Sequence, residues 1–84
     1  MDLELSLTIQ FSKNLSEKEQ EVLLDSLIEE IERMDLRAGG GNYSDKLDWI
    51  IDFSDSKLDK GKIIDRLGDF LLSKDELILN FKIG

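Results

Sequence analysis

The chain offers carboxylates rather than imidazoles or thiols for chemistry, because it contains no His and no Cys. Two carboxylate pairs stand close together in the sequence, Asp52 with Asp55 and Glu29 with Glu30. Such pairs do acid–base work when their surroundings push their pKa values apart. We expect Asp52 on the polar side of a strand, Asp55 at a helix cap and the two glutamates on a solvated helix face. The sequence therefore predicts a protein that is not an enzyme.

Metal and cofactor sites are also not expected. Zinc, copper and haem sites draw most of their ligands from His and Cys. The segment from Asp55 to Gly61 resembles a calcium loop, but Lys57 stands where an oxygen ligand is needed and the glycine comes one place late. We predict no metal and no cofactor.

A run of three glycines, Gly39–Gly41, is the feature that folding alone does not explain, since consecutive glycines lose much backbone entropy on ordering. It lacks the Gly-Lys-Ser/Thr ending of a phosphate loop and leads into a strand rather than a helix. Two interpretations stay open: a hairpin turn, or a recognition loop whose neighbours contact a partner. The candidate partner-binding residues are Arg37, Gly39, Gly40, Gly41, Asn42, Tyr43 and Lys46.

The elements that carry this run follow from hydrophobic periodicity. Period-two alternation predicts strands over 3–11, 47–53 and 77–83, and the odd-numbered residues of each are expected to be buried. Ser16 with Glu19 forms a capping box that starts a helix over 17–33. Its expected apolar stripe is Leu23, Leu24, Leu27, Ile28, Ile31 and Met34. Residues 35–38 can form only a short strand before the glycines, and a second helix carries Ile63 to Leu71.

The resulting order is β-α-β-β-α-β in one domain, residues 1–84. We expect an α+β, ferredoxin-like fold, with a four-stranded antiparallel sheet and two helices on one face. The outward positions of the two central strands are polar or acidic, apart from Ile50, and hold no aromatic residue for stacking on bases. The short strand near Leu36 is a possible edge for pairing with a second copy, as a homodimer.

The charge balance limits the choice of partner. Nineteen acidic and eleven basic residues give a net charge of −8 and a pI near 4.4, which disfavours binding nucleic acid through bulk charge. A basic protein partner suits this charge, as does imitation of nucleic acid. The amino terminus has no signal-peptide pattern and no apolar run is long enough to span a membrane, so we expect a cytoplasmic protein.

Leu36, the glycines Gly39–Gly41 and the strand bearing Trp49 together resemble the YggL-type family of proteins that bind the 50S ribosomal subunit. The resemblance implies ribosome association and carries no catalytic residues. Our leading hypothesis is accordingly a binding module that contacts the 50S subunit or a basic ribosomal protein through a Gly39–Tyr43 loop. The alternative is an acidic nucleic-acid mimic that inhibits a defence nuclease, using the carboxylate line Glu17, Glu21, Asp25, Glu29 and Glu32. A small-molecule regulatory or catalytic domain on the same scaffold is the third possibility.

Overall fold

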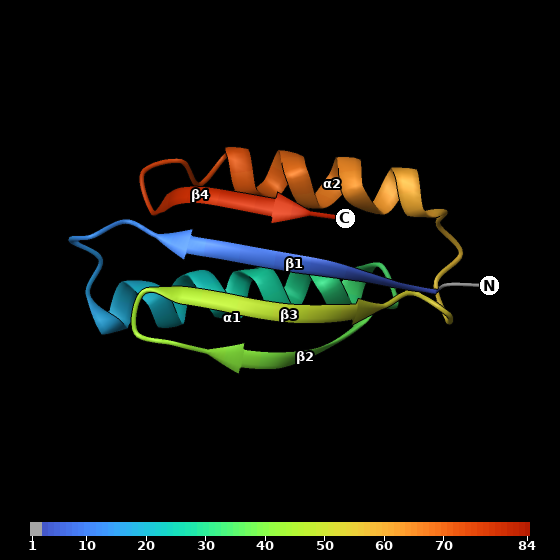
Figure 1. Ribbon diagram of the computed structural model, residues 1–84. Helices are drawn as coiled ribbons and strands as arrows, with labels where there is room; N and C mark the ends of the chain where they lie inside the picture. Colours follow the sequence, from blue (N-terminus) through green and yellow to red (C-terminus); the bar gives the residue numbers. More distant parts are fainter. Residues whose placement is uncertain (1–2) are drawn as a thin grey trace.

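The computed structural model describes residues 3–84 and confirms the predicted element order and fold (Figure 1). Met1 and Asp2 lie outside the described residues. Both belong to the predicted domain of residues 1–84 and to the amino terminus, in which no signal peptide is expected. The elements are β1 (Glu4–Phe11), α1 (Glu17–Arg33), β2 (Arg37–Asn42), β3 (Lys46–Asp52), α2 (Lys60–Leu72) and β4 (Ile78–Ile83).

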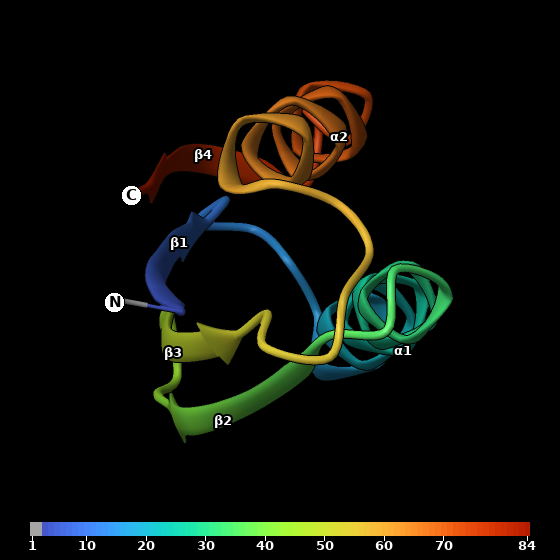
Figure 2. The same ribbon diagram turned by 90° about the vertical axis from the view of Figure 1, so that its right-hand side faces the viewer.

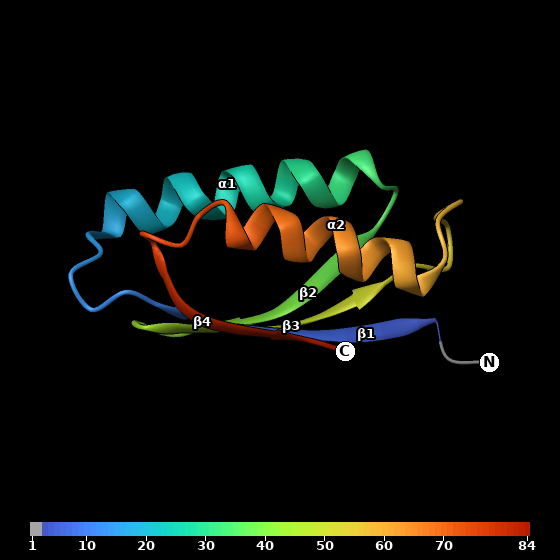
Figure 3. The ribbon, with the colours of Figure 1, turned by 90° about the horizontal axis from the view of Figure 1, so that it is seen from above.

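The four strands form one antiparallel sheet in the order β2-β3-β1-β4, which makes β2 and β4 the two edges. Both helices lie on the same side of this sheet, as the end-on view shows (Figure 2). Helix α1 contacts β2 and helix α2 contacts β4, and seen from above the helices run alongside each other over the strands (Figure 3). This arrangement is the ferredoxin-like α+β fold.

The core fills the space between the helices and the sheet. The inward residues of β1 and β3 are buried as their alternation predicts, and Leu27, Ile31 and Leu67 from the helices pack against them. The capping box predicted at the start of α1 is present, with the Glu19 amide donating to Ser16 Oγ at 3.2 Å. Burial of apolar surface against the sheet and the hydrogen-bonded amino-terminal end of α1 therefore both stabilise this fold.

Three predicted inward residues are exposed. Leu3 precedes the first residue of β1 and is 37% exposed. Ile28 of α1 is 41% exposed, because it lines a hollow beside β2, a strand that offers no large side chain to cover it. Leu79 of β4 is 57% exposed, while its neighbour Ile78 is buried. A register shift between β1 and β4 is the cause: Gln10 pairs with Asn80 but Phe11 pairs with Ile78, so Leu79 is an extra, bulged residue.

Candidate functional site

The glycine run does not form the loop that the sequence predicts. Gly39, Gly40 and Gly41 lie inside strand β2 and pair with Ile50, Trp49 and Asp48 of β3. The predicted short strand over 35–38 is therefore also wrong, since β2 begins at Arg37 and continues through the glycines. The connection to β3 comes later, at residues 43–45. Pairing with β3 holds the glycines extended, and this tertiary contact outweighs their low intrinsic preference for strands.

Gly40 is required by its contact with Trp49. Its φ of +154° is one that side-chain-bearing residues rarely adopt. A Cβ there would overlap the Asp48 carbonyl oxygen and lie only 2.8 Å from Trp49 Cα. The Trp49 indole Nε1–H donates to Asn42 Oδ1 at 3.0 Å, so the same strand also supplies the polar partner of the ring. The glycine and the asparagine thus fit β2 onto Trp49, which is 9% exposed.

The backbone of β2 is open along its outer edge. Residues in an antiparallel pair alternate between those that exchange hydrogen bonds and those that do not. The Tyr43 amide donates to the Lys46 carbonyl at 2.7 Å, which sets the phase of this alternation. From the register, the backbone N–H and C=O groups of Ala38, Gly40 and Asn42 point away from β3. They form an unpaired row of donors and acceptors at the edge of the sheet.

Little side-chain structure protects this edge. Five of the six residues of β2 are exposed, the exception being the half-buried Gly41, and the three glycines present no side chain on either face. Natural sheets usually guard an edge with a bulge, a proline, an inward-pointing charge or a covering segment. None of these devices lies along Ala38–Asn42. We call the row of outward backbone groups from Ala38 to Asn42 the β2 edge.

The predicted site residues separate into two groups at opposite ends of β2. Tyr43 and Lys46 lie at the β2–β3 turn, where the Tyr43 ring is exposed and packs over Gly41, and Lys46 Nζ is 6.0 Å from the ring centroid. Arg37 lies at the other end, six residues before Tyr43 and so about 20 Å away at the usual rise per strand residue. Its guanidinium contacts Asp55 at 3.0 Å. The structure therefore does not bring all seven residues to one point, and the β2 edge joins the two groups.

The carboxylates predicted to have structural roles all have polar or charged partners, but the Glu30 side chain is only 17% exposed and so does not lie on the solvated face expected for it. Glu29 and Glu30 contact Arg33 at 3.7 and 3.6 Å, and Glu30 also contacts Arg66 at 3.5 Å. Asp55 does not cap a helix, since the cap of α2 is Asp59, whose carboxylate accepts from the Lys62 amide. Asp55 lies too far before the start of α2 to cap it, and its carboxylate instead contacts Arg37.

The pKa of Asp52 is lowered in the folded protein. The backbone amide of Ser54 donates to Asp52 Oδ1 at 2.8 Å. Hydrogen bonds from Ser54 to the ionised form lower the Asp52 pKa below its ordinary value of 3.8, and the Arg37 charge lowers it further. A lowered pKa keeps the group ionised at neutral pH, which suits an anchor for the β3 terminus and not a proton donor.

A groove that the sequence analysis missed runs beside the β2 edge, between β2 and helix α1. It has a volume of about 360 Å³ and an apolar lining formed by Ile28, Ile31, Leu36, Ala38 and Trp49, with Glu32 and Arg37 at its rim. The sequence contains its two components separately, a wide apolar stripe on α1 and a strand without large side chains, but does not show that they lie side by side. We call this hollow the α1–β2 groove.

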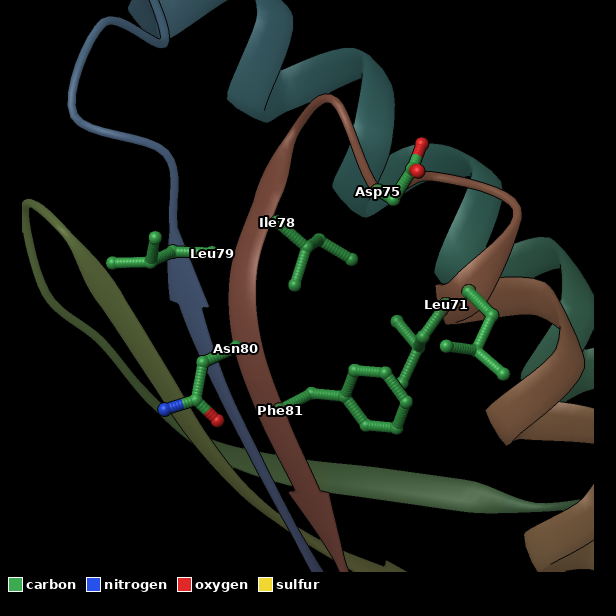
Figure 4. Close-up of a pocket in the computed structure, with 7 residues that line it drawn as sticks. Leu71, Asp75, Ile78, Leu79, Asn80 and Phe81 are labelled. Carbon is green, nitrogen blue, oxygen red and sulfur yellow. The ribbon is translucent and has the colours of Figure 1, made fainter.

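A second hollow, of about 310 Å³, lies at the opposite edge of the sheet, between β4 and α2 (Figure 4). Leu71, Ile78 and Phe81 gather on one side of β4, whereas Leu79 points away from them. The bulge at Leu79 and the charged side chain of Lys82 are guarding devices, and neither has a counterpart between Ala38 and Asn42. The two edges of the sheet therefore differ in their readiness to pair with another chain.

Within residues 3–84, no three acidic side chains converge closely enough to hold a metal ion, and none of the helices has the length and apolar character needed to cross a membrane. Comparison of the chain with protein-family models and with curated proteins gave no match.

Proposed function

We propose that this domain is a non-enzymatic binding module that associates with a basic protein surface of a large assembly, and that this assembly is the 50S ribosomal subunit. The contact surface is the β2 edge together with Arg37 at one end and the turn residues Tyr43 and Lys46 at the other. A role at the ribosome implies a cytoplasmic location. The resemblance of the Leu36–Trp49 segment to the YggL-type family supports the choice of partner.

The observation that carries this proposal is the unguarded β2 edge. Its outward backbone groups at Ala38, Gly40 and Asn42 have the geometry of a strand that pairs with another chain. The glycines on both sides of Gly40 leave room for close approach, and a Cβ at Gly39 would meet nothing within 4 Å. A solvent-exposed strand of this kind is a liability unless a partner uses it.

The charge of the domain supports a basic partner. The net charge of the domain is −8. Attraction between this charge and a basic surface speeds the encounter of the two proteins, and repulsion disfavours acidic partners. Because such attraction is screened by salt, binding should weaken as ionic strength rises.

Sedimentation of the purified domain with 50S subunits at low salt tests the proposal. Two variants make a matched pair: Ala38→Lys adds a charge at the β2 edge, and Leu79→Lys adds the same charge at the opposite edge. Both positions are exposed, so both variants should fold. We expect the wild type and Leu79→Lys to co-sediment with the 50S peak in a salt-sensitive manner and Ala38→Lys to remain at the top of the gradient. Absence of the wild type from the peak at low salt would contradict the proposal.

A second candidate function is an acidic nucleic-acid mimic that inhibits a defence nuclease or another nucleic-acid-binding protein. One observation favours it: the five predicted carboxylates along α1 are all exposed, at Glu17, Glu21, Asp25, Glu29 and Glu32. Replacing them with the corresponding amides should abolish competition with DNA for a nuclease. Under the leading proposal, the same replacement weakens 50S binding only through the loss of bulk charge.

A further inference from the structure

The β2 edge and the α1–β2 groove lie next to each other and share residues. Ala38 belongs to both, and Trp49, which pairs with Gly40, lines the floor of the groove. Ile28 stands on the α1 side of the groove with 41% of its surface exposed. A chain placed along the β2 edge would therefore meet backbone groups on one side and an apolar hollow beside them.

The register of β2 determines which side chains of an added strand enter the groove. Residues directly opposite each other in a sheet place their side chains on the same face. Ala38 and Gly40 pair with Ile51 and Trp49, which face the helices. A side chain opposite Ala38 or Gly40 would thus point to the helix side, towards Ile28 and Trp49. The side chains between them would lie on the open face, beside Gly39 and Gly41.

Charge discriminates between the possible occupants. A second copy of this chain would bring a net charge of −8 against another −8, a juxtaposition that disfavours association. Glu32 and Asp35 flank the end of the groove, in a small hollow that Arg37 and Asp55 also line. A basic segment gains attraction from the same charges that oppose a second copy.

We propose that the β2 edge accepts an extended basic segment of a partner protein as a fifth strand, and that one apolar side chain of this segment occupies the α1–β2 groove. Main-chain hydrogen bonds to Ala38, Gly40 and Asn42 supply the ladder, and the groove supplies selectivity. This binding mode rests on the proposed role as a binding module, but it does not depend on the ribosome being the partner.

Trp49 provides the readout, because it is the single tryptophan of the chain and lines the groove. The probe is a short peptide of alternating lysine and valine, titrated into the domain at low salt. One control peptide has every backbone amide N-methylated, so that neither of its edges can donate hydrogen bonds to a ladder. A second control replaces lysine with glutamate. We expect a saturable change in Trp49 emission with the lysine–valine peptide and none with either control.

Two variants test the groove separately from the edge. Ile28→Ser removes an exposed apolar side chain from the groove, and Val22→Ser removes one from the same helix outside it. We expect Ile28→Ser to weaken peptide binding roughly tenfold, equivalent to about 1.4 kcal/mol, and Val22→Ser to leave it unchanged. Circular dichroism confirms that both variants retain their helices.

Several results would overturn this binding mode. Equal binding of the N-methylated peptide would reduce the interaction to charge alone. An unchanged affinity for Ile28→Ser would remove the groove from the contact, and a wild-type dimer that Ala38→Lys dissociates would make the occupant a second copy. Failure of the proposed function gives a different result from failure of this binding mode. Peptide binding without 50S co-sedimentation would exclude the ribosome as the partner. Co-sedimentation that Ala38→Lys leaves intact would exclude the β2 edge as the contact surface.

Discussion

Replacing Gly40 with alanine should destabilise this domain far more than the same change one residue earlier. Both glycines lie in β2 and both are exposed, so a sequence-based argument treats them alike. The structure separates them. Gly40 has a φ of +154° and no space for a Cβ, which would overlap the Asp48 carbonyl oxygen, whereas Gly39 has no atom within 4 Å of that position.

The magnitude follows from two costs at Gly40. A residue held in a backbone region that favours glycine costs about 1–3 kcal/mol. Overlap with backbone atoms of Asp48 and Trp49 cannot be relieved by rotating a side chain, and such overpacking costs about 1–3 kcal/mol more. We therefore expect Gly40→Ala to lower the free energy of unfolding by about 3 kcal/mol in total. For Gly39→Ala, we expect no loss or a gain of up to about 1 kcal/mol, because alanine restricts the unfolded chain.

Thermal unfolding followed by circular dichroism at the helix bands measures this difference without relying on Trp49, whose local surroundings change in the Gly40 variant. At about 4–8 °C per kcal/mol for a domain of this size, Gly40→Ala should melt at least 10 °C below Gly39→Ala. Domains of this length have a stability of roughly 4–13 kcal/mol, so the variant should still fold at low temperature. Melting temperatures within about 3 °C of each other would refute the assignment of Gly40 as the residue that fits β2 onto β3.

Three further predictions follow from single residues. Ser16→Ala removes the hydroxyl that accepts from the Glu19 amide and should lower the free energy of unfolding by about 1 kcal/mol in urea titrations. Asp35 follows Met34, the C-cap of α1, with a φ of 57°, a conformation that costs most residues about 1–2 kcal/mol. Asp35→Gly should therefore raise the melting temperature, and Asp35→Ala should not. Because the pKa of Asp52 is lowered in the folded state, its contribution to stability is complete above pH 3.8 and is lost as the pH falls through the folded value. Asp52→Asn keeps an acceptor for Ser54 and should show a weaker loss of stability below pH 4 than the wild type does.

The parts of the fold that the sequence predicts correctly are those that local sequence patterns determine. Strict alternation in 3–11 and 47–53 identified the two central strands, because each has one face in the core and the other in solvent. Ser16 and Glu19 located the start of α1, because a capping box satisfies its donors within four residues. The two crossovers then left few topologies open.

The incorrect predictions concern features that depend on pairing between strands. Glycine runs usually form turns, and only the ladder with β3 and the fit of Gly40 against Trp49 keep Gly39–Gly41 extended. The bulge at Leu79 likewise arises from the register between β4 and β1, which the sequence of β4 does not contain. Ile28 fits the apolar period of α1, and its exposure depends on the neighbouring strand β2, which has no large side chain to cover it.

The residues of the candidate site remain a prediction, and the sequence did not predict their arrangement. The glycine run was correctly singled out as unusual, and Arg37 and Tyr43 do lie at its two ends. Its interpretation as a hairpin turn or a recognition loop did not predict the two features proposed for binding, the β2 edge and the α1–β2 groove. Both arise where an edge strand without large side chains lies beside a helix, and this juxtaposition appears only when the fold is assembled.

Amide hydrogen exchange of the domain, free and in complex with 50S subunits, tests the central claim most directly when it is read residue by residue. In the free protein, the amides of Gly40 and Asn42 should exchange quickly, and those of Gly39 and Gly41, which face β3, should exchange slowly. On binding, we predict new protection at Ala38, Gly40 and Asn42. Protection confined to the acidic face of α1, or an unchanged pattern along β2 in a complex that has formed, would contradict the assignment of the β2 edge as the binding surface.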